Sequence, residues 1–437
     1  MPGRYLTVDE LTSRAERLAA MQPDRVVLRR IGASRAGEPI RSLSVGRGSR
    51  HVLVVAGPHA NEPVGGVTAL RLARYLARAG RPDRFRYTAD TTWHFLLCLD
   101  PDGARRNERW LRGPMTFVHH YRHFYRPGFA GQPEWLPAES GAAPMPETRA
   151  LLELQDELRP FLQCSLHGVD VGGSFVQLTR GLPGMADKLV RSAGDLRIPV
   201  ELGPYDAFFW PSPGPGVYDM PQPEETDQFD SLPASTAAST WFHPHRYGTF
   251  TAVVEAPMWG ADEVGDTAAH PDPGAALETI SRTLRKDALL LTELVERIRP
   301  ALLDTATPLL APVEEYLAVC PGLAEEWAPG TAGALPPLNR ARVMSLRIAA
   351  RRLVVRTAGL LSQLLAQDAP YVRRDLARVD AVRNTLDRFL AERCDAFEAD
   401  CRVRWIPVHD QVEHQFRVVL AAAELAGRFS ETKVVRA

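Results

Sequence analysis

Cysteine and excess charge are both scarce in this 437-residue chain. Its five cysteines are widely spaced and form no CxxC pair, which argues against a disulfide scaffold and favours reduced thiols in the cytoplasm. The 52 basic and 53 acidic residues nearly cancel. Because a nucleic-acid-binding protein needs a strongly basic surface, we expect no nucleic-acid partner.

Long apolar runs and lysine are missing as well. No segment reaches the roughly 18 consecutive apolar residues of a membrane span, so we expect no membrane partner. The first 20 residues are polar and lack the apolar core of a secretory signal, which also favours a cytoplasmic location. The only lysines are Lys188, Lys286 and Lys433, and we interpret the dominance of arginine as a compositional habit of the source genome.

Apolar residues make up 45% of the chain, enough for a sizeable core, and the length predicts two or three domains. Residues 260–274 are rich in Gly, Asp and Pro and are typical of a linker. We therefore predict two domains, 1–268 and 269–437.

The first half alternates strand-like and helical patterns. Apolar runs at 51–57 and 93–101 are typical of strands buried on both faces, and 65–80 has helical periodicity. We also expect a helix over 151–163, a short strand over 164–168 and a late strand over 249–257. This alternation predicts an α/β fold with a mostly parallel central sheet flanked by helices.

The second half is dominated by helical patterns, at 273–301, 337–367, 370–400 and 407–427. The Pro- and Gly-rich segment 302–336 is expected to be loop-like, with one short helix near 312–318. We predict an all-α bundle that packs on the first domain, caps its cleft or forms a homodimer. The sequence does not choose among these three.

Histidines and acids follow three of the predicted strands. His59 and Glu62 stand in the loop after a buried strand, and His167 follows another. Ligands in an open α/β sheet gather at the carboxyl ends of such strands. Two histidines and one glutamate form a catalytic zinc site with a position open for water, and Glu255 on the late strand is a candidate base.

These residues occur in motifs that resemble the zinc carboxypeptidase family, the carboxypeptidase A-like metallopeptidases. HANEPVG (59–65), PDG (101–103), SLHG (165–168) and TFTAVVEAP (249–257) follow one another in the family's order. The resemblance covers residues 5 to about 260 and leaves out the helical half.

The resemblance implies a carboxypeptidase-like fold and a role for each motif residue. His59, Glu62 and His167 would bind one Zn²⁺ per chain. Glu255 would activate water for attack on an amide bond and pass its proton to the leaving amine. The expected substrate is a small peptide or peptide-like metabolite that loses its C-terminal residue.

The sequence departs from the family around substrate binding. Family members carry an arginine that polarises the scissile carbonyl and an Asn-Arg pair that grips the terminal carboxylate, but here Asn107 precedes Glu108. Arginine binds both oxygens of a carboxylate, so we predict Arg105 as the catalytic arginine and Arg109 with Asn107 as substrate-binding residues. Tyr218 is the expected pocket tyrosine, and HHYRHFYR (119–126) is expected at the surface or in the substrate pocket.

Two other functions remain open at this stage. A zinc amidase or deacylase acting on an N-acyl amino acid or a natural-product intermediate would explain the missing Asn-Arg pair. A catalytically silent, peptide-binding relative would be expected to have a damaged zinc site. A comparison of free and amidated C-termini would separate a carboxypeptidase from the amidase.

Overall fold

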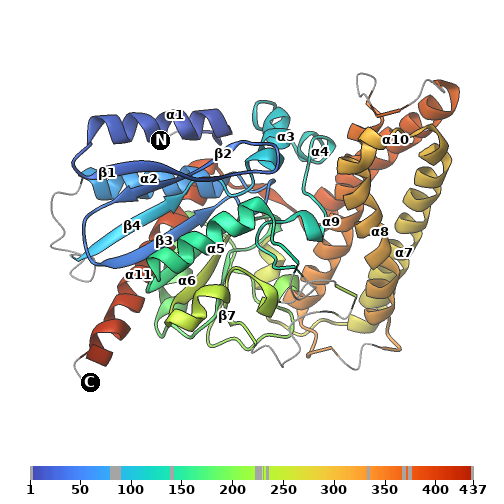
Figure 1. The fold of residues 1–437 in the computed structure, drawn as a ribbon. Helices are drawn as coiled ribbons and strands as arrows, with labels where there is room; N and C mark the ends of the chain where they lie inside the picture. The colour runs from blue at the N-terminus through green and yellow to red at the C-terminus, as the bar shows by residue number, and fades with distance from the viewer. Residues whose placement is uncertain are drawn as a thin grey trace.

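The computed structural model describes residues 3–78, 90–137, 142–221, 229, 231–232, 236–331, 335–366, 371–372 and 376–434. It has a mixed sheet covered by helices, with further helices beyond it (Figure 1). The predicted α/β fold class is confirmed. The helices are α1 (Val8–Met21), α2 (Val64–Arg78), α3 (Pro101–Leu111), α4 (Phe117–Arg122), α5 (Pro146–Leu158), α6 (Met185–Leu196), α7 (Pro273–Ile298), α8 (Thr307–Glu326), α9 (Arg340–Leu364), α10 (Leu376–Cys401) and α11 (Val408–Val434).

The sheet runs in the order β1-β2-β4-β3-β5-β8-β6-β7, and β9 pairs with β8. Its centre is parallel, since β4, β3, β5 and β8 all run in one direction. The strands are β1 (Val26–Ala33), β2 (Pro39–Val45), β3 (Arg50–Ala56), β4 (Thr91–Leu96), β5 (Leu162–Gly172), β6 (Phe175–Leu178), β7 (Val217–Asp219), β8 (Phe250–Gly260) and β9 (Arg404–Trp405).

Both faces of the central strands are buried, which explains their continuous apolar runs. Along β3, Val52 and Val54 belong to one apolar cluster, and Leu53 and Val55 belong to a second cluster that includes side chains of α5. A strand exposes successive side chains to opposite faces, so these two clusters lie on the two sides of the sheet.

Two expected elements have different bounds. The 151–163 helix is α5, which begins at Pro146 and ends at Leu158, and the strand that follows is longer than 164–168, running from Leu162 to Gly172. Glu255 accordingly lies in the middle of β8 rather than at its end.

The expectation that 302–336 is loop-like is wrong. Residues Thr307–Glu326 form α8, which contains Pro312 and Pro321 within the helix. Proline disfavours the interior of a helix because it lacks the amide hydrogen. Here α8 packs against both α7 and α9, and this packing outweighs the local preference.

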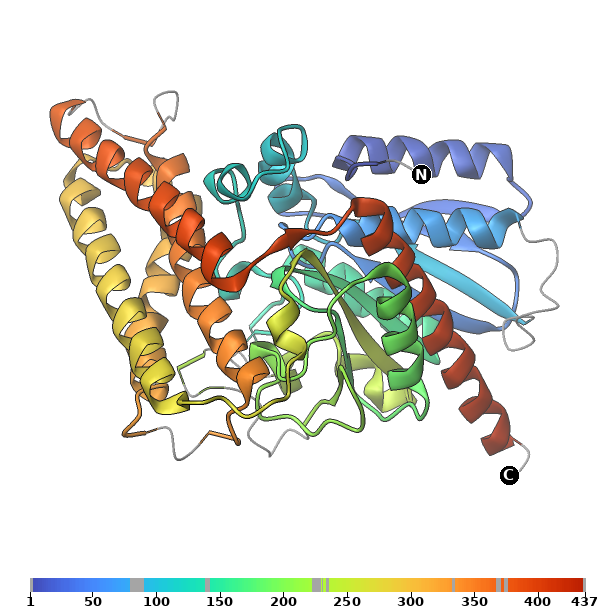
Figure 2. The same ribbon diagram turned by 180° about the vertical axis from the view of Figure 1, so that it is seen from behind.

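The helical half forms two groups. Helices α7 to α10 pack together at one end of the sheet, whereas α11 returns to the sheet and packs against α2, α6, β5 and β8 (Figure 2). The division at residue 268 therefore stays a prediction. No helix within the described ranges is long and apolar enough to cross a membrane.

Candidate metal centre and substrate cavity

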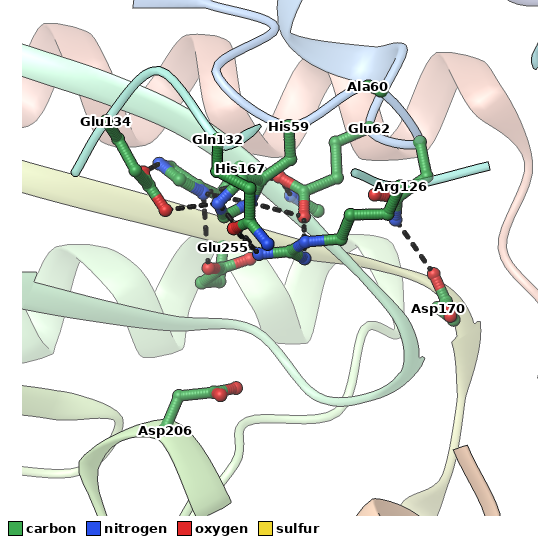
Figure 3. Close-up of polar contacts among 12 residues, drawn as sticks. His59, Ala60, Glu62, Arg126, Gln132, Glu134, His167, Asp170, Asp206 and Glu255 are labelled. Atoms are coloured by element: carbon green, nitrogen blue, oxygen red, sulfur yellow. Dashed lines mark hydrogen bonds and ion pairs between the residues drawn. The ribbon is translucent and has the colours of Figure 1, made fainter. Parts of the chain in front are cut away.

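The sheet places the motif residues at one point. Gly57, in the left-handed region with φ of 60°, turns the chain out of β3 into the loop that carries His59 and Glu62. His167 on β5 and Glu255 on β8 are direct partners across a parallel strand pair. The four side chains converge in Figure 3.

Three donor groups lie at ligand spacing. The Nδ1 atoms of His59 and His167 are 3.2 Å apart, and they lie 2.8 and 3.2 Å from the two carboxylate oxygens of Glu62. Zinc bonds of about 2.0–2.2 Å put neighbouring tetrahedral ligand atoms roughly 3.3–3.6 Å apart. Two of the three separations are close to this range, and the three buried side chains fit a zinc ion in number and type.

Glu134 is a site residue that sequence analysis missed. Its carboxylate contacts Nε2 of His59, and its second oxygen lies 3.4 Å from Nε2 of His167. A carboxylate on the outer nitrogen of a ligating histidine fixes the ring and makes it more basic. Glu134 therefore contacts the outer nitrogen of His59 and lies near that of His167, which is hydrogen-bonded to the Ser165 hydroxyl at 2.9 Å.

The charges of this cluster oppose one another strongly. Burial, and then the neighbouring Glu62, raise the pKa of Glu255 well above its usual value. Burial by itself would raise the pKa of Glu62 as well. The charge of His59 and hydrogen bonds from both histidines outweigh burial, so this pKa lies below its usual range. Oε2 of Glu255 accepts no hydrogen bond from the described residues. A cation is the group that such a set of buried acids lacks.

Arg126 is the arginine at the cluster. Its guanidinium lies 3.3 Å from Oε1 of Glu62, 2.8 Å from Nε2 of His59 and 3.0 Å from Oε1 of Gln132. It is the last residue of HHYRHFYR, so the structure brings one member of that segment to the pocket. No fixed spacing in the sequence distinguished it from the other arginines of this region.

The predicted arginine and asparagine lie on α3, outside the cavity. Arg105 forms ion pairs with Asp9 and Glu38, both at 2.8 Å, and Arg109 is exposed. Asn107 is buried and binds backbone groups, donating to Ala60 O and accepting from Tyr125 N, both at 3.0 Å. Its contacts are structural, since they join the His59 loop to the segment that carries Arg126.

Tyr218 is also placed away from the cavity. Its ring packs in a buried cluster beside β6, and its hydroxyl donates to the backbone oxygen of Glu201 at 3.0 Å. The ring lies inside the fold because β7 pairs with β6, which a single sequence does not reveal.

A cavity of about 160 Å³ opens over the cluster. Its walls come from both halves of the chain, with Trp210 and Trp241 from the first half and Tyr316, Arg352 and Arg356 from α8 and α9. Helices of the second half therefore cover part of the site, which corresponds to the expected arrangement in which the helical bundle caps the cleft of the first domain. The homodimer stays a prediction.

The sequence profile of the zinc carboxypeptidase family matches residues 11–174. The matched region covers less than half of the chain and is similar to this family. The match includes His59, Glu62 and His167, and it ends before Glu255 and the helical half. No curated protein matches the chain.

The solved structures similar to this chain include two carboxypeptidases. A metallo-carboxypeptidase from Burkholderia cenocepacia is 16% identical, with a TM-score of 0.39, over 58% of this chain and 60% of its own. Carboxypeptidase A from Helicoverpa armigera is 15% identical, also with a TM-score of 0.39, over 59% of this chain and 65% of its own. In both comparisons this chain spans less than two thirds of the related chain.

Proposed function

We propose that this protein is a zinc-dependent metallocarboxypeptidase that removes the C-terminal residue of a small peptide or peptide-like metabolite. The convergence of His59, Glu62 and His167 beside Glu255 is the observation that supports it. The three ligands would hold one zinc ion per chain. When bound, zinc lowers the pKa of water and polarises a carbonyl group.

The proposed roles of the protein groups follow from their positions. Oε1 of Glu255 lies 3.8 Å from Nδ1 of His167, so its carboxylate faces the ligand atoms and can take a proton from the attacking water. As the water oxygen bonds to the carbonyl carbon and the C–N bond breaks, Glu255 gives that proton to the leaving nitrogen. Arg126 is proposed to donate hydrogen bonds to the carbonyl oxygen, the role that the sequence suggested for Arg105.

The first test is the substitution Glu255→Gln, which keeps the size of the side chain and removes the base. We expect full zinc content by elemental analysis and a loss of kcat of about 10²- to 10⁴-fold on N-acetylated dipeptides. Glu38→Gln is the control, because Glu38 pairs with Arg105 away from the cavity. Retained activity in Glu255→Gln would contradict the assignment of the base.

Two further measurements test the proposal: the zinc content of a ligand variant, and the relative rates on substrates with free and amidated C-termini. His167→Ala should lose the metal, and full zinc occupancy in this variant would exclude His167 as a ligand. A preference for free over amidated C-termini is expected of a carboxypeptidase, whereas equal rates on both would favour the amidase alternative.

A further inference from the structure

The cavity over the cluster has three arginines in its walls, and they differ in what they already bind. Arg126 is held by Glu62, His59 and Gln132. Nε of Arg356 donates to Asp170 at 2.8 Å, and its guanidinium lies over the ring of Phe124. Arg126 is thus placed at the metal ligands, where its proposed partner is the carbonyl oxygen, and Arg356 is committed to contacts inside the protein.

Arg352 is different. Within the described residues its one ion pair is with Asp206, at 3.6 Å, which is too long for a hydrogen bond, and its charge also acts on the buried carboxyl group of Glu201. The Arg352 side chain is only 12% exposed, whereas that of Asp206 is 45% exposed. A mostly buried guanidinium thus keeps its donors for a further acceptor, and Asp206 can turn to water when that acceptor arrives.

The surroundings of Arg352 suit the end of a peptide. The cavity is smaller than the roughly 300–1,000 Å³ of common ligand pockets, so it has room for a short segment only. Trp210, Trp241 and Tyr205 line it together with Arg352. In Figure 3, Asp206 lies apart from His59, Glu62 and His167. The Arg352–Asp206 pair is therefore a second polar region in the wall of the same cavity.

We infer that Arg352, on α9 of the helical half, binds the terminal carboxylate of the substrate through its guanidinium. This inference rests on the proposed peptidase function and adds the residue that selects the substrate's end. The planar guanidinium matches both oxygens of a carboxylate. The chain thereby replaces the missing Asn-Arg pair with an arginine from outside the family-like region, and α9 becomes part of the binding site.

The test measures binding separately from turnover. N-acetyl-alanyl-phenylalanine and its C-terminal amide are titrated calorimetrically into zinc-loaded protein carrying Glu255→Gln, which holds the probe without cleaving it. We expect the free acid to bind at least 10-fold more tightly than the amide. Adding Arg352→Ala should weaken binding of the acid by about 10- to 100-fold and leave the amide unchanged. Arg352→Lys should restore part of the preference.

Arg351→Ala is the matched control. Arg351 is the neighbouring residue on α9, is 18% exposed, and pairs with Asp400 on α10, and it lines a different cavity. It should leave the acid-to-amide ratio unchanged, and thermal unfolding shows whether each variant is folded. An unchanged ratio in both Arg352 variants, an equal loss in Arg351→Ala, or no binding of either probe would overturn the inference.

The outcomes also separate this inference from the proposed function. With the native Glu255, Arg352→Ala should raise KM for the free acid with little change in kcat. Arg352-dependent binding of the acid without any hydrolysis would leave the inference standing and reject the peptidase function. Hydrolysis that prefers the free acid equally strongly with and without Arg352 would do the reverse, because it would leave the peptidase function standing and overturn the inference.

Discussion

At the scale of single residues, the site depends on which nitrogen of each histidine faces which group. The Nδ1 atoms of His59 and His167 converge with Glu62, and their Nε2 atoms both face Glu134. Glu134 thus orients the His59 ring, and the Ser165 hydroxyl, 2.9 Å from Nε2 of His167, orients the second ring. Burial by itself would lower the pKa of His167, but the charge of Glu134 and a hydrogen bond donated to Glu62 raise it above its usual value.

We predict that Glu134→Gln weakens zinc binding by about 10- to 100-fold, because the amide keeps the shape but not the charge that orients the His59 imidazole and lies near that of His167. Competition with a chromogenic chelator measures the affinity. Glu147→Gln is the control, since Glu147 is equally buried but accepts from the backbone nitrogen of Arg35 instead. Equal zinc affinity in the two variants would show that Glu134 does not support the ligands.

At the scale of elements, a buried ion pair connects α9 to β5, the strand that carries His167. Asp170 lies on β5, three residues after His167, and receives hydrogen bonds from Arg356 at 2.8 Å and Asn61 at 3.3 Å. Burial by itself would raise the pKa of Asp170. The charge of Arg356 outweighs burial, so this pKa lies below its usual range. The same aspartate therefore contacts both the His59 loop and the helix that covers the cavity.

Removing one partner of this pair should be costly, because it leaves the other charge buried. We predict that Arg356→Met lowers the free energy of unfolding by about 3–5 kcal/mol, and that adding Asp170→Asn restores part of it. Urea unfolding measures both. The control is Arg402→Met, which breaks an exposed pair with Glu263 and should cost about 0–1 kcal/mol. Equal losses in the two single variants would contradict the argument.

The elements also show how far the sequence alone could lead. Thr7 and Glu10 form a capping box on α1, a feature that can be recognised from the sequence because it depends only on residues three apart. The motif residues came together because they stand on neighbouring strands of the parallel sheet: His59 and Glu62 follow β3, and His167 and Glu255 are direct partners within β5 and β8. Glu134, Arg126 and Arg352 were missed because they stand in loops and on a helix whose positions depend on packing between distant segments.

At the scale of the whole molecule, two elements that follow the predicted domain boundary at residue 268 pack against the domain before it. Segments β9 and α11 lie beyond residue 268, yet β9 extends the sheet at Trp259 and Gly260, and α11 covers β5 and β8. On α11, Gln415 donates to the backbone oxygens of His167 and Val254 at 2.6 and 3.2 Å. The last helix thus supports the strands that carry a proposed ligand and the proposed base.

Removal of the helical half is therefore expected to unfold the first. The buried apolar side chains of α11 contribute about 1.5–3 kcal/mol each, so five of them together match the whole stability of an ordinary domain. These five are Val412, Val418, Val419, Leu420 and Leu425. We predict that residues 1–268 alone show no cooperative thermal transition by circular dichroism and bind no stoichiometric zinc.

The informative control keeps α11 and removes α7 to α10, by joining residue 268 to residue 403 through a short Gly-Ser linker. This junction is feasible because Arg404 pairs with Gly260, only a few residues before the cut. The internal deletion should regain a cooperative transition that residues 1–268 lack, since its sheet is covered again. A cooperative transition and full zinc content in residues 1–268 would instead show that the family-like region folds without its returning helix.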